Sequence, residues 1–323
     1  MAELRFSIDR CDLSVVSGWV DQDGPVSSLI VILGEKQICD LSPTAYRHDL
    51  EQEGVGDGRR AFTFPLSGYL FDGLNRVSVV VNGEEIYDKL LPFHYGLVDN
   101  GPTGFGENQA LLDYSQTRWK GDEPPESLTW GRLMTGDTLW EVYREARRFV
   151  GTENILEIGP GYGRLLDSAL KLKVPFGSYT GVELSPVRSA LLSAKYKQRN
   201  VKFQTGDVID WRGATPFDVV ISSVAFDFLY PDCRKALTNL RGQMAAGAHV
   251  FADFVRTEEK TAHFESNGTF IRRYPEAELK EIFSECGFTL RKIAPCTLGQ
   301  ASHGPVERSV VIAQASGNAK QAR

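Results

Sequence analysis

One run of the sequence, ILEIGPGYGRLL, limits the possible folds of this 323-residue chain more than any other. An apolar burst leads there into Gly159, Gly161 and Gly163, and a helical pattern follows. Glycines let the backbone turn tightly and approach a ligand, and the helix that follows points free N–H groups and its positive dipole end at an anion. A dinucleotide-binding motif, GxGxxG, would need its third glycine at position 164, which is Arg164 here. The third glycine comes one residue earlier, so the motif reads ExGxGxG. The run predicts a strand, a ligand-binding turn and a helix.

Strands and helices alternate from about residue 139 to residue 316. The apolar bursts are NILEIG, YTGVEL, VKFQ, FDVVISS, AHVFADF, FTLRKI and SVVIAQ, interleaved with the helical stretches RLLDSALKL, SPVRSALLSAKYKQ, DCRKALTNLRGQM and PEAELKEIFSECG. Ser185 before Pro186 predicts a helix start, and Gly242 and Gly287 predict helix ends. Continuous apolar strands flanked by amphipathic helices indicate a parallel sheet covered on both faces. We therefore expect a doubly wound, Rossmann-like α/β domain over 139–316.

Residues 1–92 follow a different pattern. The short bursts LSVVSGWV, SLIVIL, AFTFPL, RVSVVV and EEIYDKLL are separated by turn-forming pairs, and the segments 21–26 and 81–85 resemble hairpin turns. This spacing predicts a small all-β sandwich. The aromatic-rich residues 93–138 are expected to pack on the following domain as a connector and cofactor cap, and the polar residues 317–323 are expected to form a flexible tail.

Charge and composition exclude several classes of protein. The formal net charge is -6 and the pI is near 5.5, so the broad positive surface that nucleic acid binding needs is not indicated. The amino terminus lacks an apolar signal segment, and no apolar run approaches the length of a membrane span. Five scattered cysteines without a CxxC pair fit reduced thiols better than disulfides or zinc ligands. We expect a cytoplasmic protein that neither spans a membrane nor binds nucleic acid.

Four landmarks give the α/β region a resemblance to class I S-adenosylmethionine-dependent methyltransferases. In order they are ExGxGxG with Glu157, Gly159, Gly161 and Gly163, then Glu183 in GVELSP, then Asp207 in TGDV, then the strand FDVVISS. The resemblance covers about residues 145–315 and implies S-adenosylmethionine as cofactor. It further implies that the glycine turn holds the methionine portion, that Glu183 binds both ribose hydroxyls, and that Asp207 meets the adenine amino group beside Val208. The alternative is that Glu183 and Asp207 merely end strands, but their position after the glycine motif favours the cofactor roles.

A second resemblance concerns the segment LTWGRLMTGDTLWEVYREARRFVGTENILEIGPGYGRLL. It looks like the cofactor-capping helix of methyltransferases associated with bacterial O-antigen and capsular polysaccharide synthesis. The resemblance implies that this region folds over the cofactor and brings several side chains toward it: Tyr114, Trp119, Trp130 or Arg132, and the run 134–137. Alternatively, the aromatic side chains simply pack a helix on the domain.

The amino-terminal stretch VSGWVDQDGPVSSLIVILGE is similar to β-sandwich modules attached to bacterial glycosyltransferases and related polysaccharide enzymes. An exposed aromatic side chain, Trp19, Tyr46 or Tyr69, could stack there on a sugar ring. For Trp19, alternation along the strand favours a place in the sandwich core with Val16 or Val20.

Methyl transfer requires an aligned nucleophile and, for a hydroxyl, a group that takes its proton. Two residues are candidates for this base: Asp227 after the fourth strand, and His263 in the polar insertion RTEEKTAHFESNGTFIRRY. Asp253 and Glu258 are weaker candidates. Asp227 and Asp253 could converge on a metal, but no recognisable ligand spacing occurs, so no metal site is predicted. The family's Asp/Asn-Pro-Pro-Tyr signature is missing, which argues against DNA-type amine methylation.

The sequence thus predicts a two-domain methyltransferase. The resemblances imply a carbohydrate acceptor, methylated on a sugar hydroxyl or a terminal phosphate during polysaccharide synthesis. One alternative is a small-molecule or protein methyltransferase in which the sandwich is a dimerisation element of a homo-oligomer. Another is a cofactor-binding scaffold without catalytic activity.

Overall fold

The computed structural model describes residues 4–22, 26–93, 108–121, 136–265, 267–301 and 304–316. They form two compact units: the residues up to 93 together with Asn108–Leu111, and the residues from Leu112 onward. The segments 94–107, 122–135 and 317–323 lie outside the described residues. The predicted domain boundaries, connector and tail therefore stay predictions.

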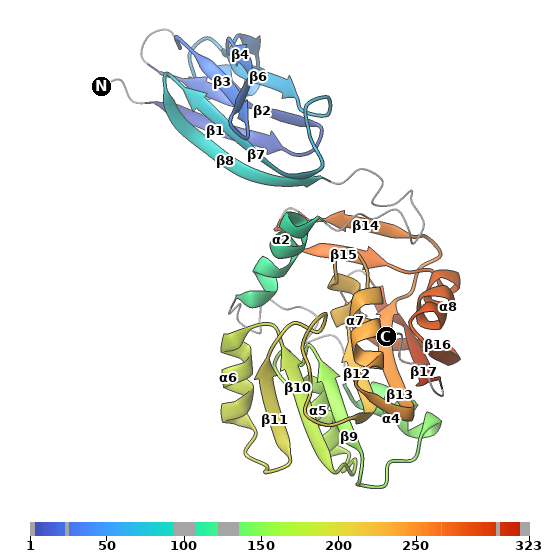
Figure 1. The fold of residues 1–323 in the computed structure, drawn as a ribbon. Coiled ribbons are helices and arrows are strands. Elements are labelled where there is room, and N and C mark those ends of the chain that lie inside the picture. The colour runs from blue at the N-terminus through green and yellow to red at the C-terminus, as the bar shows by residue number, and fades with distance from the viewer. Residues whose placement is uncertain are drawn as a thin grey trace. The chain divides into compact units, whose positions relative to one another are not determined.

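The amino-terminal unit is a small all-β domain, as predicted (Figure 1). Its elements are β1 (Arg5–Cys11), β2 (Val15–Asp21), β3 (Leu29–Leu33), β4 (Lys36–Leu41), β5 (Ala45–Tyr46), α1 (His48–Gln52), β6 (Arg59–Pro65), β7 (Gly73–Val81) and β8 (Glu84–Phe93). Two antiparallel sheets, ordered β1-β2-β6-β5 and β4-β3-β7-β8, share one core to which Val16 and Val20 contribute from one sheet and Val31 and Val79 from the other.

Two details of this unit differ from the sequence predictions. The turn at 81–85 joins the antiparallel pair β7 and β8 as predicted, but β2 and β3 belong to different sheets, so the predicted hairpin at 21–26 is wrong. Trp19 does not enter the core with Val16 and Val20. It is only partly buried and packs against a separate small cluster that includes Leu50, because alternation puts it on the opposite face of β2.

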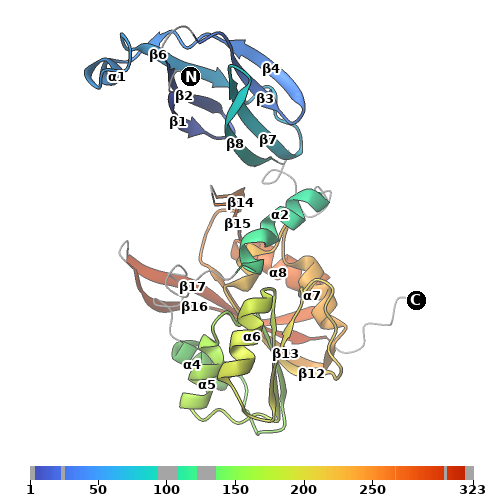
Figure 2. The ribbon, with the colours of Figure 1, turned by 90° about the vertical axis from the view of Figure 1, so that its left-hand side faces the viewer.

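The second unit is a doubly wound α/β domain. Helix α2 (Gln109–Lys120) belongs to this unit from Leu112 onward. The other elements are α4 (Gly136–Ala146), β9 (Asn154–Ile158), α5 (Arg164–Lys171), β10 (Ser178–Glu183), α6 (Pro186–Lys195), β11 (Val201–Thr205), β12 (Phe217–Ser223), η2 (Ala225–Phe228), α7 (Arg234–Arg241), β13 (Met244–Val255), β14 (Thr261–Phe264), β15 (Phe270–Arg273), α8 (Glu276–Glu285), β16 (Phe288–Ala301) and β17 (Gly304–Ala315). Seven of the unit's described strands form a sheet ordered β11-β10-β9-β12-β13-β17-β16, in which β13–β17 and β17–β16 pair in antiparallel fashion and the other neighbours are parallel. Helices α4 and α5 cover one face, and α7 and α8 cover the other (Figure 2).

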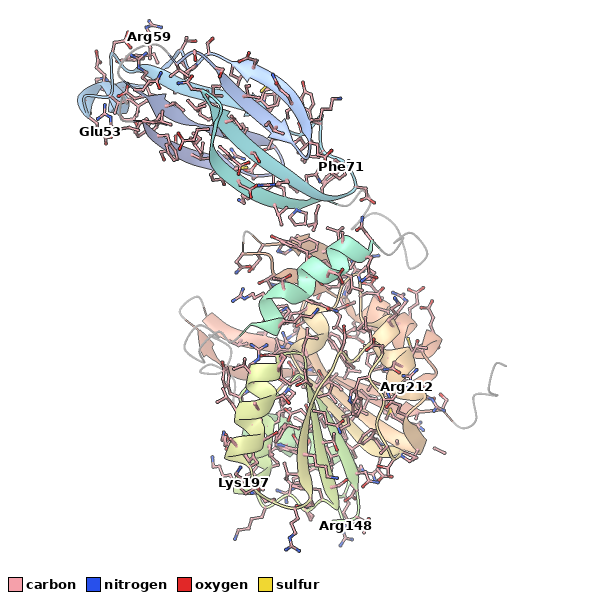
Figure 3. The ribbon with its side chains drawn as sticks, turned by 60° about the vertical axis from the view of Figure 1, so that its left-hand side comes forward. Glu53, Arg59, Phe71, Arg148, Lys197 and Arg212 are labelled. Carbon is pink, nitrogen blue, oxygen red and sulfur yellow. The ribbon has the colours of Figure 1, made fainter. Side chains whose placement is uncertain are left out.

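Local signals placed the helices correctly. Ser185 caps α6 by accepting a hydrogen bond from the Arg188 backbone N–H at 3.2 Å, with Pro186 in the first turn, and Gly287 after α8 has φ +82°. Strands β14 and β15 form a small hairpin inserted after β13. Helix α2 packs on this hairpin through Tyr114 and Phe264, whose ring centroids lie 5.8 Å apart. Figure 3 shows Arg148 and Lys197 at the end of the sheet away from α2.

Candidate functional site

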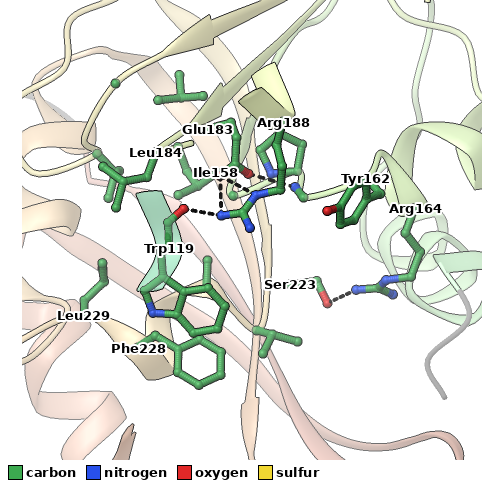
Figure 4. Close-up of a pocket in the computed structure, with 18 of the residues that line it drawn as sticks. Trp119, Ile158, Tyr162, Arg164, Glu183, Leu184, Arg188, Ser223, Phe228 and Leu229 are labelled. Atoms are coloured by element: carbon green, nitrogen blue, oxygen red, sulfur yellow. Dashed lines mark hydrogen bonds and ion pairs between the residues drawn. The ribbon is translucent and has the colours of Figure 1, made fainter. Parts of the chain in front are cut away.

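A cavity of about 740 Å³ lies at the carboxyl ends of the parallel strands, a usual place for ligands in open α/β sheets. Its volume falls within the ~300–1,000 Å³ typical of small-molecule sites. Its walls come from α2, the start of α4, the glycine turn, the ends of β10 and β12, the loop after β11, and η2 (Figure 4). The sequence-predicted residues on these walls are Trp119, Gly136 and Asp137 from the run 134–137, Gly159, Gly161, Glu183, Asp207 and Val208.

The three glycines of the turn have different tasks. All have positive φ: 65° at Gly159, 57° at Gly161 and 86° at Gly163. A Cβ at Gly159 would lie 2.9 Å from the Ala225 Cβ, and one at Gly163 would collide with the Tyr196 hydroxyl. A Cβ at Gly161 would meet nothing within 4 Å, so this position borders open space in the cavity. Gly163 does not line the cavity and instead allows α5 to pack on Tyr196.

Glu183 ends β10 with a buried carboxylate that is held from two sides. Its Oε2 accepts a hydrogen bond from the Gly161 N–H at 3.0 Å. Its Oε1 accepts one from the Ser185 N–H at 3.0 Å and forms an ion pair with Arg188 at 3.1 Å. The carboxylate is thus fixed against the glycine turn, where a ribose ring could donate its hydroxyl hydrogens.

Asp207 follows β11 and lines the cavity beside Val208. One oxygen accepts a hydrogen bond from the Ile209 N–H at 3.1 Å, and the other accepts one from the Gln116 side-chain amide of α2. Burial raises the pKa of Asp207. This oxygen of Asp207 therefore lies at the cavity wall and accepts from the NH₂ group of Gln116.

Helix α2 contributes an aromatic wall. Trp119 packs on Phe228 with ring centroids 4.7 Å apart, and Tyr230 lines the cavity nearby. The Trp119 Nε1–H is buried and has no hydrogen-bond partner among the described residues. Tyr114 does not line the cavity, because its ring packs against the β14–β15 hairpin, and Arg132 lies outside the described residues, as does Trp130.

Glu157, the first residue of the glycine motif, is buried beneath the cavity rather than on its wall. Its carboxylate accepts a hydrogen bond from the Tyr179 hydroxyl at 2.6 Å. Burial raises the pKa of Glu157 to about 7. Glu157 is therefore a buried acid of β9 that is paired with Tyr179 of β10, not a cavity residue.

Asp227 is not placed as a base would be. It is 1% exposed and does not line the cavity. Its carboxylate pairs with Arg308 at 2.8 Å, and the same guanidinium donates to Asp253 at 2.6 Å. Burial raises the pKa of Asp227 to about 6, against the opposing effect of Arg308. The geometry indicates a buried ion-pair cluster rather than contact with an acceptor.

His263 is also away from the cavity. It lies on β14, opposite Ile271 of β15, with an exposed side chain. No group of three or more potential metal ligands occurs within the described ranges, and no helix in them is long and apolar enough to cross a membrane.

The cavity residues that sequence reasoning missed include Gln116, Arg164 and Arg188. Arg164 donates to the Ser223 hydroxyl at 2.6 Å, which joins the glycine turn to the end of β12. The signal for Arg188 was its place one turn into a helix that starts directly after Glu183. Gln116 gave no local signal, because its partner Asp207 is far away in the sequence.

Comparisons with known proteins bear on the α/β unit. Residues 156–250 match a family model described as a methyltransferase domain. Among solved structures, 1,6-didemethyltoxoflavin-N1-methyltransferase of Burkholderia thailandensis, with bound 1,6-didemethyltoxoflavin and S-adenosylhomocysteine, is 15% identical, with a TM-score of 0.55 over 77% of this chain and 98% of the other. An S-adenosylmethionine-dependent methyltransferase of Mesorhizobium loti is 13% identical, with a TM-score of 0.45 over 55% and 97%. One of Methanosarcina mazei is 16% identical, with a TM-score of 0.44 over 55% and 99%. The search of curated proteins gave no match.

The α/β unit therefore contains a methyltransferase domain and has a Rossmann-like fold. S-adenosylmethionine, whose demethylated form S-adenosylhomocysteine is bound in the Burkholderia enzyme, is the cofactor to compare with this cavity. The residues present fit this cofactor, because Gly161 leaves the cavity open while Glu183 and Asp207 offer acceptor oxygens on neighbouring walls.

Proposed function

We propose that the protein transfers a methyl group from S-adenosylmethionine to an oxygen of a carbohydrate acceptor, either a sugar hydroxyl or a terminal phosphate. The cofactor supplies the activated methyl group. In this proposal the glycine turn holds its methionine portion, Glu183 accepts hydrogen bonds from its ribose, and Asp207 accepts one from its adenine amino group.

The observation that carries the acceptor proposal is the aromatic wall at the α2 side of the cavity. Trp119 and Phe228 offer apolar ring faces, and a sugar ring has an apolar face that packs on such rings. The buried Nε1–H of Trp119 lacks an acceptor among the described residues, and a buried indole N–H normally has one. A hydroxyl or phosphate oxygen would satisfy it.

The charges around the cavity favour the phosphate form of this acceptor. Among the described cavity residues, the carboxylates are Asp137, Asp167, Glu183 and Asp207. Asp137 pairs with Lys171, and Asp167 pairs with Lys195, while the other two have the proposed cofactor roles. A phosphate oxygen is already anionic and requires no base, and the Arg164 guanidinium lies on the cavity wall to orient it.

A labelled-methyl transfer assay tests the proposal. The protein is incubated with methyl-labelled S-adenosylmethionine and a panel of nucleotide sugars and oligosaccharides, each paired with its dephosphorylated form. Label on the phosphorylated members alone supports a phosphate acceptor, and label on both forms supports a hydroxyl. Trp119→Phe should raise KM for the acceptor, whereas Trp211→Phe, which changes an indole outside the cavity, should not.

A second candidate is methylation of a small planar heterocycle. The Burkholderia enzyme carries such a compound, and the wall of Trp119, Phe228 and Tyr230 also suits a flat ring. If the same assay labels flat heterocycles and no saccharide, the carbohydrate proposal is wrong and this one replaces it.

We also propose that residues 1–92 are an accessory module for glycan binding. Tyr46 and Tyr69 are 49% and 47% exposed, so their rings are accessible to a sugar. A fragment of residues 1–92 should fold alone and show β-type circular dichroism. Shifts of its NMR signals upon titration with acceptor polysaccharide would support glycan binding, and unchanged spectra would favour a dimerisation role.

A further inference from the structure

Arg188 is a buried arginine that links two parts of the cavity wall. Its side chain is 3% exposed and lies in α6, just after β10. Its guanidinium contacts the Glu183 carboxylate through Nε at 3.2 Å and through a terminal nitrogen at 3.1 Å. The same terminal nitrogen donates to the backbone carbonyl of Trp119, in the last turn of α2 (Figure 4).

A second link runs beside the first. The Ser185 hydroxyl donates to the Gly121 carbonyl at 2.8 Å, and the Ser185 N–H donates to Glu183. Ser185, the N-cap of α6, and Arg188, in the first turn of α6, therefore each bind both the acid at the end of β10 and a carbonyl at the end of α2. The carbonyls at a helix carboxyl end carry partial negative charge, which a guanidinium neutralises.

We infer that Arg188 is a positioning residue that fixes the ribose-binding carboxylate and helix α2 to each other, so that cofactor affinity and the ordering of α2 are coupled. The inference rests on the proposed ribose role of Glu183. Arg188 acts through Glu183 and α2 and makes no contact with reacting atoms.

The chemistry requires arginine at this position. A planar guanidinium presents several N–H donors in fixed directions and reaches the carboxylate and the Trp119 carbonyl at once. A lysine keeps the charge, but its compact ammonium cannot reproduce this fork. Because α2 also carries Gln116 and the Trp119 ring into the cavity, a loosened carboxyl end would disturb the adenine side and the aromatic wall together.

The experiment compares Arg188→Lys with a matched control, Arg241→Lys. Arg241 likewise donates to backbone carbonyls, those of Gly287 and Ser316, but it lies at the end of α7 and does not line the cavity. Calorimetry with S-adenosylhomocysteine gives the Kd of each protein. Hydrogen exchange with mass spectrometry reports the protection of the α2 amides, with and without S-adenosylhomocysteine.

We expect Arg188→Lys to raise the Kd at least tenfold and to speed exchange in α2, with incomplete protection even at saturating S-adenosylhomocysteine. Arg241→Lys should leave both readouts as in the unchanged protein. Wild-type affinity or wild-type α2 exchange in Arg188→Lys would overturn the inference. If Arg188→Lys does not fold, Ser185→Ala decides: faster α2 exchange with a severalfold higher Kd supports the inference, and unchanged values overturn it.

Glu183→Gln separates this inference from the proposed cofactor site. If Glu183→Gln binds S-adenosylhomocysteine with unchanged affinity, Glu183 is not part of the ribose site, and the proposed coupling is wrong as well. The α2 exchange of Arg188→Lys without S-adenosylhomocysteine would still report whether Arg188 holds the helix. Weakened binding in Glu183→Gln with normal binding in Arg188→Lys would overturn only the inference.

Discussion

The cavity lies at the carboxyl edge of the sheet, and the acidic residues in the two halves of this edge have different surroundings. At the ends of β10 and β11, Glu183 and Asp207 border the cavity and keep acceptor oxygens at its wall. At the ends of β12 and β13, Asp227 and Asp253 turn into the protein, where both contact Arg308. Acids near strand ends thus border the cavity in one half and form buried ion pairs in the other. The difference depends on whether a distant arginine is buried against them.

The structural half holds a strained turn. Val224, directly after β12, has φ +72°, a conformation that costs a β-branched residue on the order of 1–3 kcal/mol. The Asp227 N–H donates to the Val224 carbonyl at 3.0 Å, and Arg308 holds the Asp227 carboxylate. We interpret the ion pair as the contact that keeps this turn in place, since Val224, Ala225 and Phe228 form part of the cavity wall.

The largest effect is expected from Arg308→Met. Removal of the 0% exposed guanidinium leaves two buried carboxylates without their partner. Breaking a buried pair in this way costs about 3–5 kcal/mol of unfolding free energy, which urea unfolding followed by circular dichroism would measure. Arg256→Met is the control, because its exposed pair with Glu307 at 3.9 Å should contribute less than ~1 kcal/mol. Equal losses in the two variants would refute the structural role of Arg308.

A pH effect of similar size is expected from Glu157. Its pKa is about 7 in the folded protein against an ordinary value of 4.5, chiefly because of burial. Folding therefore favours the protonated acid, so its stabilising contribution is full below about pH 4.5 and is lost as the pH rises to about 7. The total loss is about 3 kcal/mol. Urea unfolding at several pH values should show a shallower decline for Glu157→Gln, and parallel curves for the two proteins would contradict this.

A smaller effect, on the affinity for S-adenosylhomocysteine, compares Glu183 in one half of the sheet edge with Asp227 in the other. Glu183→Ala should weaken S-adenosylhomocysteine binding by about 1–3 kcal/mol, because charge-assisted hydrogen bonds to the ribose are lost. Asp227→Asn in the structural half keeps an oxygen that can accept from Arg308 and so keeps the turn in place. It should alter the Kd less than about threefold, since this side chain does not line the cavity. Calorimetry on both variants measures the contrast. A larger change of the Kd in Asp227→Asn than in Glu183→Ala would contradict the roles assigned to these two acids.

Local patterns were enough to predict the strand ends and the turn that border the cavity beside Glu183. The strands, the cap at Ser185 and the glycine turn depend on neighbours in the sequence, and so does the position of Glu183 at the end of β10. The role of Asp227 could not be predicted in this way, because its partner Arg308 comes from β17, far along the chain. The same holds for Gln116, whose contact with Asp207 depends on how α2 packs. Trp19 was misplaced for a local reason, since the alternation of β2 was assigned to the wrong face.

The smallest effect is expected from His263→Ala. A general base contributes roughly a hundredfold to ten-thousandfold to the rate, but only when it reaches the proton that it removes. The exposed position of His263 on β14 lies outside the cavity, so its removal should change single-turnover methyl transfer less than about twofold between pH 6 and 9. Phe264→Ala on the same strand is the useful contrast, because that ring packs against Tyr114 of α2 and its loss should loosen the helix. If His263→Ala instead slowed transfer to a hydroxyl acceptor a hundredfold, the β14–β15 hairpin would have to reach the acceptor, and the second half of the cavity edge would be catalytic as well as structural.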